Sequence, residues 1–132
     1  MNAKTTRLRP ADLWLKIRQE VEQELSRDPI LADYLHSAIL RHATLGEALA
    51  CYLSGKLVCR NVQEDALRAL FMDAYSAEPR LLKVACVDLE AIAQRDAAWR
   101  SYSGSLLFFK GFQALQAYRV AHFYWTHDRH YL

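Results

Sequence analysis

PADLWLKIRQEVEQEL, residues 10–25, is the stretch that first indicates the fold, because its apolar residues recur every four positions. Leu13, Ile17, Val21 and Leu25 fall on one face of an α-helix, and the glutamates between them fall mostly on the other. Pro10 suits the first helical turn, where its missing N–H is not needed. The stretch therefore predicts an amphipathic helix that begins near residue 10.

Similar signals recur along the chain. Asp28 is expected to cap a second helix that starts at Pro29 and runs to about residue 42. Thr44 and Glu47 have the spacing of a capping box, in which the two residues satisfy free backbone amides at the start of a helix. Gly55 is expected to end that helix in a left-handed conformation.

The second half of the chain repeats the pattern. A cap signature at residues 61–64 precedes an apolar stripe that reaches residue 74, and Pro79 opens a further helix to about Ile92. Residues 95–105 are the longest stretch without periodicity, and a final helix is predicted from near Leu106. No strand alternation or internal repeat is visible. The prediction is an all-α fold of about six or more helices and no sheet.

Composition agrees with one helical domain. The chain has 132 residues with only 4 glycines and 3 prolines, and helix interiors tolerate both residue types poorly. We expect residues 1–9 to form a polar N-terminal tail and residues 10–132 to form the helical domain.

The charge pattern argues against nucleic acid as a partner. The net charge is +2 with both signs interspersed, and the nearest basic set, Lys4, Arg7 and Arg9, is interpreted as a solvated tail. A helix–turn–helix over residues 29–55 is disfavoured because its second helix would offer Glu47 to the groove. No apolar stretch of membrane-spanning length and no signal-peptide core is present, so we expect a cytoplasmic protein.

Neither the cysteines nor the histidines form a recognisable site motif. Cys51, Cys59 and Cys86 lack paired spacing and are interpreted as small buried hydrophobes. His127 and His130, three apart, could face one metal ion in a helical bundle, but surface or interface histidines are the favoured interpretation. No phosphate loop or nucleophile motif is present, so we expect no cofactor or metal to be bound by this chain.

The final predicted helix is unusually aromatic, and its aromatic residues are spread around most of its circumference. They are Phe108, Phe109, Phe112, Tyr118, Phe123, Tyr124 and Trp125. A helix that is apolar on nearly all sides must be covered on nearly all sides. A subunit contact is the simplest cover, so self-association is predicted.

Asp96 is the main candidate for a ligand-binding side chain. It ends a predicted helix, where the helix dipole disfavours a carboxylate. Arg95 could offset this effect, or Asp96 could cap the next segment. An aspartate held in such a loop could also pair with the ammonium group of an amino acid.

The run Lys110-Gly111-Phe112-Gln113-Ala114-Leu115-Gln116-Ala117-Tyr118-Arg119-Val120-Ala121-His122 resembles a segment of serine O-acetyltransferases, which reads K-G-F-x-A-L-Q-A-Y-R. Three further stretches resemble the family in the same order: residues 29–35, residues 40–49, and residues 88–91 with 95–96. The resemblance covers roughly residues 10–132 and implies the N-terminal helical domain of such an enzyme.

The resemblance implies a transfer of an acetyl group from acetyl-CoA, the family co-substrate, to L-serine in cysteine biosynthesis. In the family, the catalytic His and Asp and the CoA site lie in a C-terminal left-handed β-helix, whose hexapeptide signature is absent from this chain. The family forms hexamers as dimers of trimers, and its C-terminal tail binds O-acetylserine sulfhydrylase. The chain alone is therefore expected to be inactive.

One site residue carries over from the resemblance. Asp96 matches the family aspartate that contacts L-serine and the inhibitor cysteine, so it is predicted to bind substrate. The family often has Pro at the next position, where this chain has Ala97. Two alternatives stay open: a free-standing helical oligomerisation or regulatory module derived from the family, and a metal-binding helical bundle.

Overall fold

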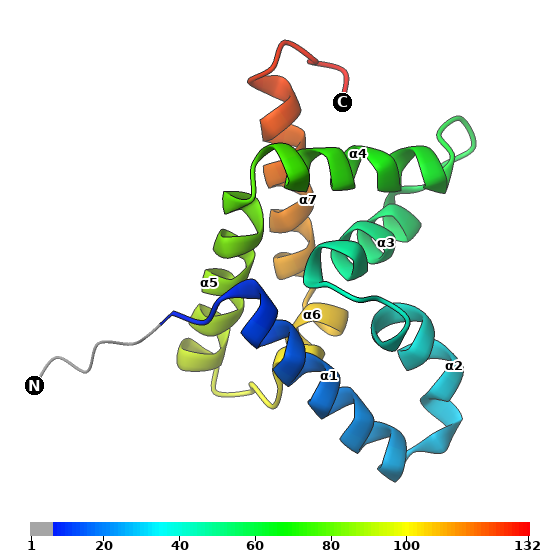
Figure 1. Cartoon of the computed structure of the whole chain (residues 1–132), viewed down its shortest axis with the longest axis vertical. Helices are drawn as coiled ribbons and strands as arrows, with labels where there is room; N and C mark the ends of the chain where they lie inside the picture. The colour runs from blue at the N-terminus through cyan, green and yellow to red at the C-terminus, as the bar shows by residue number, and fades with distance from the viewer. Residues whose placement is uncertain (1–6) are drawn as a thin grey trace, which may run out of the picture.

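The computed structural model describes residues 7–132, and these residues are helical over most of their length (Figure 1). The described helices are α1 (Pro10–Arg27), α2 (Ala32–Leu35), α3 (Leu45–Leu57), α4 (Glu64–Ala77), α5 (Arg80–Arg95), α6 (Tyr102–Phe108) and α7 (Lys110–Trp125). The only extended pairing within residues 7–132 is an isolated bridge between Cys59 and Val62. The all-α prediction is confirmed. Most of the predicted N-terminal tail, Lys4 included, lies outside the described residues.

The helices form two groups around a shared core (Figure 1). α3 and α4 pack against each other, while α5 and α7 run side by side. α1 crosses the base and contacts α3, α5 and α6. The short helix α6 therefore lies between α1, α5 and α7, which is the arrangement that positions the candidate site.

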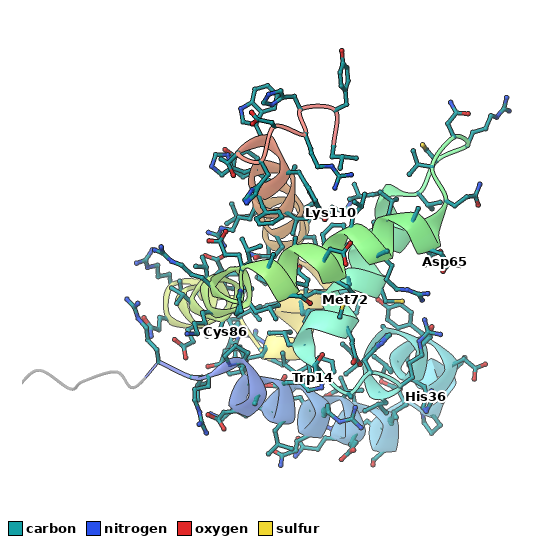
Figure 2. All side chains as sticks on the ribbon, turned by 45° about the horizontal axis from the view of Figure 1, so that its top comes forward. Trp14, His36, Asp65, Met72, Cys86 and Lys110 are labelled. Atoms are coloured by element: carbon teal, nitrogen blue, oxygen red, sulfur yellow. The ribbon has the colours of Figure 1, made fainter. Side chains whose placement is uncertain are left out.

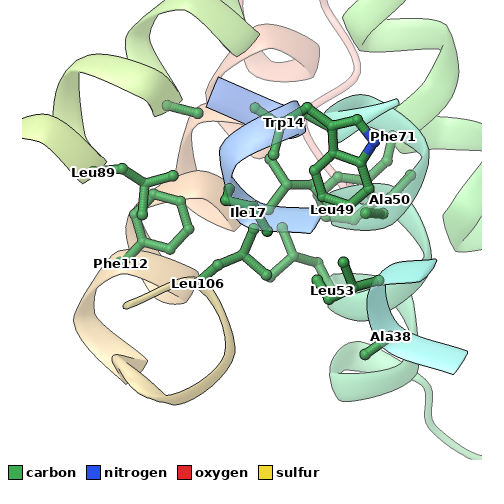
Figure 3. Close-up of a cluster of buried hydrophobic side chains, with 14 of the residues drawn as sticks. Trp14, Ile17, Ala38, Leu49, Ala50, Leu53, Phe71, Leu89, Leu106 and Phe112 are labelled. Carbon is green, nitrogen blue, oxygen red and sulfur yellow. The ribbon is translucent and has the colours of Figure 1, made fainter. Parts of the chain in front are cut away.

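The core gathers residues from nearly every helix (Figure 3). Ile17 of α1 lies near Leu49 of α3 and Leu106 of α6, and all three are at most 1% exposed. Burial of such a side chain stabilises the fold by about 1.5–3 kcal/mol. The predicted stripe of α1 is mostly confirmed, since three of its four members are buried and Leu25 is partly buried.

The predicted capping box at α3 is confirmed with one change of partner. Thr44 Oγ1 accepts a hydrogen bond from the Glu47 amide at 3.2 Å. The Glu47 carboxylate accepts from the amide of Ala43 at 2.8 Å, one residue before the cap. The box therefore starts α3 and also fixes the turn that leads into it.

Three other predicted capping signals are wrong, although the second helical segment does begin at Pro29 as predicted. α3 continues through Gly55 to Leu57, and no glycine within residues 7–132 has a positive φ. Asp28 makes no capping hydrogen bond through its side chain. α4 begins after Gln63, whose side chain also makes no capping bond, so the signature at residues 61–64 does not act as a cap.

The second predicted helix changes pitch twice. It is a 3-10 turn over Pro29–Leu31, then α2, then a π-helical turn over His36–Leu40. The guanidinium of Arg18 donates to the Leu40 carbonyl at 2.9 Å and to the His42 carbonyl at 2.8 Å. A side chain from α1 thus satisfies carbonyls that the end of this helix leaves free.

The prediction of one final helix from Leu106 is also wrong. Two helices are present, because α6 begins at Tyr102 and the chain breaks at Phe109 before α7. Ser101 Oγ accepts from the Gly104 amide at 3.0 Å and caps α6. The buried Ser103 and Ser105 lie within that helix, so a stretch with the composition of a polar loop is partly helical.

Within the described residues, no helix is both long and apolar enough to cross a membrane.

Candidate functional site

Asp96 lies where the sequence predicts it, at the last turn of α5. Its amide donates to the Ile92 carbonyl at 2.9 Å, and its own backbone is extended (φ −93°, ψ 113°). The helix therefore ends at this residue, and the chain turns away into residues 97–101. Asp96 is exposed to solvent.

The Asp96 carboxylate closes a tight turn. Its Oδ1 accepts from the Ala98 amide at 2.8 Å, and the Asp96 carbonyl accepts from the Trp99 amide at 3.1 Å. Among residues 7–132, Oδ2 has no hydrogen-bond partner, and Arg95 forms no ion pair with this carboxylate. Asp96 does not cap α6, since Ser101 does that. The side chain is held by one oxygen and offers the other to solvent.

A shallow depression of about 450 Å³ adjoins this carboxylate. Its lining combines Asp96 and Arg95 with apolar side chains, including Ile92 and Phe109. Phe109 is the residue between α6 and α7, so the depression is bounded by the end of α5 and the break before α7. A carboxylate and a guanidinium beside an apolar wall can hold a small zwitterion such as an amino acid.

The loop after Asp96 is tied to α1 by Glu20. The two carboxylate oxygens of Glu20 accept from the amide of Tyr102 at 3.2 Å and from that of Ser103 at 2.8 Å. The Trp99 ring also packs edge-on against Tyr102, with centroids 5.3 Å apart. The sequence pattern places Glu20 on the solvent face of α1 and does not reveal this role. No local signal shows it, because the partners are 82 and 83 positions away.

The inward-pointing residues of the 110–122 motif join α7 to both α5 and α6. Gln116 Nε2 donates to Asp88 Oδ2 at 2.7 Å, and the guanidinium of Arg119 bonds both oxygens of the same carboxylate. Gln113 Nε2 donates to the Leu106 and Leu107 carbonyls at the end of α6. Asp88 and Arg119 are about one-fifth to one-quarter exposed. These motif residues fix helix packing and do not approach Asp96.

Each of the three C-terminal histidines lies against an aromatic ring. His122 stacks on Tyr118, His127 lies against Phe123, and His130 lies against Trp125. No group of three His, Cys, Asp or Glu side chains suited to a metal ion is found in residues 7–132.

Two of the three cysteines match the prediction. Cys51 and Cys86 are buried, and burial raises the pKa of the Cys86 thiol to about 12. Cys59 is exposed, so the prediction of a buried residue is wrong there. It lies in the short turn between α3 and α4, where the chain leaves the core.

The outer side of α7 is largely uncovered. Leu115, Tyr118 and Trp125 recur at helical spacing and are 39%, 62% and 57% exposed. Together they form an apolar face, interrupted by the exposed His122, which we call the α7 outer stripe. The predicted aromatic helix is therefore covered on one side only by residues 7–132.

Fold and site together define an all-helical domain with a carboxylate loop at one helix end. The family model for "Serine acetyltransferase, N-terminal" matches residues 13–117. The chain belongs to this family.

Individual serine acetyltransferases are also similar to this chain in sequence and in structure. The serine acetyltransferase of Haemophilus influenzae is 38% identical over 118 residues, which span 89% of this chain and 44% of the relative. A soybean serine acetyltransferase complexed with serine superposes with a TM-score of 0.87 at 40% identity, covering 92% of this chain and 50% of that one. A serine acetyltransferase in complex with cysteine gives a TM-score of 0.86 at 38% identity, over 89% of this chain and 49% of that one. The chain thus spans about half the length of the relatives it matches.

Proposed function

We propose that this chain is the assembly domain of a serine O-acetyltransferase and that it contributes Asp96 to the binding of L-serine. The observation that carries the proposal is the Asp96 carboxylate, held by the Ala98 amide through one oxygen and open to solvent through the other. The family membership and the relatives solved with serine and with cysteine support an amino-acid ligand.

The chemistry of that carboxylate suits the ammonium group of an amino acid. A charge-assisted hydrogen bond from an ammonium to a carboxylate is about twice as strong as a neutral one. The turn at residues 96–99 fixes the direction of the free oxygen before ligand arrives, which lowers the ordering cost on binding. Asp96 would then orient L-serine, and also the inhibitor cysteine, without moving a proton itself.

The remaining steps of the reaction need groups from outside this chain. The serine hydroxyl must lose a proton to a general base as it attacks the thioester of acetyl-CoA. As the family resemblance implies, that base and the CoA site belong to a hexapeptide-repeat domain. Residues 10–132 would form the helical domain that pairs trimers into a hexamer, with residues 1–9 as its tail. A cytoplasmic location and O-acetylserine sulfhydrylase as partner are part of the same proposal.

The test uses the product of the gene that encodes this chain. Acetyl transfer is followed by release of the CoA thiol, for the natural protein and for Asp96→Asn. The substitution should raise the KM for L-serine by roughly tenfold or more, because one charge-assisted contact is lost. It should leave the KM for acetyl-CoA nearly unchanged, and cysteine inhibition should weaken in parallel.

Asp65→Asn is the matched control, since Asp65 is an exposed aspartate of α4 whose one ion pair within residues 7–132 is with Arg68. An unchanged KM for serine in the Asp96 variant would refute the assignment of Asp96. A gene product that transfers no acetyl group at all would refute the enzyme and favour the free-standing helical module.

A further inference from the structure

The segment that leads into α1 lies along α5 (Figure 1). The amide of Leu8 donates to Glu90 Oε1 of α5 at 2.7 Å, which fixes the segment in place. This contact brings residues 7–10 against the first half of α5, and a pocket lies between them. The pocket shares no lining residue with the depression beside Asp96.

Four basic side chains surround this pocket. They are Arg7 and Arg9 from the segment, and Arg80 and Lys83 from α5. Arg9 is paired with Asp12 at 2.8 Å. Within residues 7–132 the other three form no ion pair. Like charges that line one pocket repel one another, and an anion between them would offset this repulsion.

Two carboxylates lie nearby, and each already has a hydrogen-bond partner. Asp12 bonds Arg9, and the Glu90 carboxylate accepts from the Leu8 amide. The first turn of α5 contains no acidic residue and has no side-chain cap, so the positive end of its dipole adds to the same potential. Four basic side chains against these two carboxylates leave the local charge positive, and the whole chain carries +2.

The floor of the pocket is apolar. Leu8, Pro10, Val84 and Val87 line it, and all four are only partly buried. The pocket holds about 350 Å³, near the lower end of the range for small-molecule sites. Its size suits one small molecule. A surface made only for phosphate would not need an aliphatic floor, and a surface made only for apolar contact would not carry four cations.

We propose that this pocket binds a small organic anion, a phosphate or carboxylate joined to a compact apolar body. The head group would lie between Arg7, Arg80 and Lys83, and the body would cover Val84 and Val87. Guanidinium groups bind phosphate and carboxylate through paired hydrogen bonds, and the apolar body removes the aliphatic floor from water. The proposal is independent of the role of Asp96.

The test is a titration of the 132-residue chain followed by amide and methyl NMR. The probe is 1-naphthyl phosphate, with inorganic phosphate and 1-naphthol as its two halves. We expect saturable shifts centred on Leu8, Val84 and Val87 for the whole probe, at submillimolar concentration. Each half alone should bind at least roughly tenfold more weakly, and high salt should weaken binding further.

Substitutions locate the site. Arg80→Gln with Lys83→Gln should weaken binding of 1-naphthyl phosphate by roughly tenfold or more, and both residues are exposed, so the fold should survive. The matched control is Arg60→Gln with Lys110→Gln, which removes the same charge at exposed positions outside the pocket. Equal weakening by both double variants, shifts spread over the whole surface, or no saturation in the millimolar range would overturn the proposal.

Discussion

α3 and α7 are alike in sequence and opposite in surroundings. Both carry apolar residues around most of their circumference, yet α3 buries eight of its thirteen residues and α7 buries five of sixteen. α3 is enclosed by α1, α4 and the π-helical turn that precedes it. α7 contacts α4, α5 and α6 on one side and leaves the α7 outer stripe uncovered.

Both sides of α7 mix polar and apolar residues. Its buried residues are Phe112, Gln113, Gln116, Val120 and Tyr124, whereas its exposed residues include Tyr118 and Trp125. Figure 2 shows side chains projecting outward from this helix near the C-terminal end of the chain. A helix that exposes large aromatic rings in this way is suited to contact with a second apolar surface. A helix that is apolar all round can therefore serve either a core, as α3 does, or a contact between subunits.

The largest expected loss of stability follows from a substitution in α3. Leu49 is 1% exposed and lies in the centre of the core, so Leu49→Ala should lower the free energy of unfolding by about 3 kcal/mol. Urea unfolding followed by circular dichroism measures the change. A loss below about 1 kcal/mol would mean that α3 is not the centre of the core and would remove the contrast with α7.

A substitution on the inner side of α7 should cause a smaller loss of stability. Arg119→Met leaves Asp88 partly buried with only Gln116 as partner, which should cost about 2 kcal/mol. The same urea measurement applies. Asp88→Asn combined with Arg119→Met should cost less than the sum of the two single changes, because they remove one shared contact. Additive losses would show that the pair does not join α5 to α7 in solution.

Removing the N-terminal cap of α3 should lower the free energy of unfolding by a still smaller amount. Thr44→Ala removes the acceptor for the Glu47 amide and should cost about 1 kcal/mol. Thr126→Ala provides the comparison, since its hydroxyl bonds the Phe123 carbonyl at the exposed end of α7. In thermal unfolding, Thr44→Ala should have the lower melting temperature of the two variants. Equal melting temperatures would contradict a stabilising role for the cap.

The smallest effect on stability is expected on the α7 outer stripe. Tyr118→Ala should change the free energy of unfolding by no more than about 0.5 kcal/mol, because the ring is 62% exposed. It should nevertheless weaken self-association, measured by sedimentation velocity over a range of concentrations. Arg60→Ala, on the exposed turn after α3, is the control. A strictly monomeric natural chain at high micromolar concentration would contradict the proposed contact.

Features set by neighbours in sequence are predictable, and features set by distant contacts are not. The stripe of α1 can be predicted because its four-residue repeat is visible within one segment, and the capping box at Thr44 because its partners are three or four residues apart. The start of α6 cannot, because a carboxylate from α1, Glu20, accepts its first amides. Gly55 has the residue type of a helix stop, although the backbone there continues as ordinary helix beside Glu64.

The candidate site shows the same division. The position of Asp96 at a helix end can be predicted from the loss of periodicity after Arg95. Its turn with Ala98 depends on backbone angles that the residue types alone do not determine. The cationic pocket is invisible in the sequence for another reason, since Arg7 and Arg80 are 73 positions apart and meet only through the packing of residues 7–10 on α5.

The exposed cysteine has a practical use. Cys59 is the single exposed thiol among three in the chain, and it lies in a short turn outside the core. A maleimide dye should therefore attach at one defined position without disturbing packing. Labelled chains mixed with unlabelled ones would report subunit exchange by fluorescence anisotropy, provided that a reductant prevents crosslinking through the same thiol.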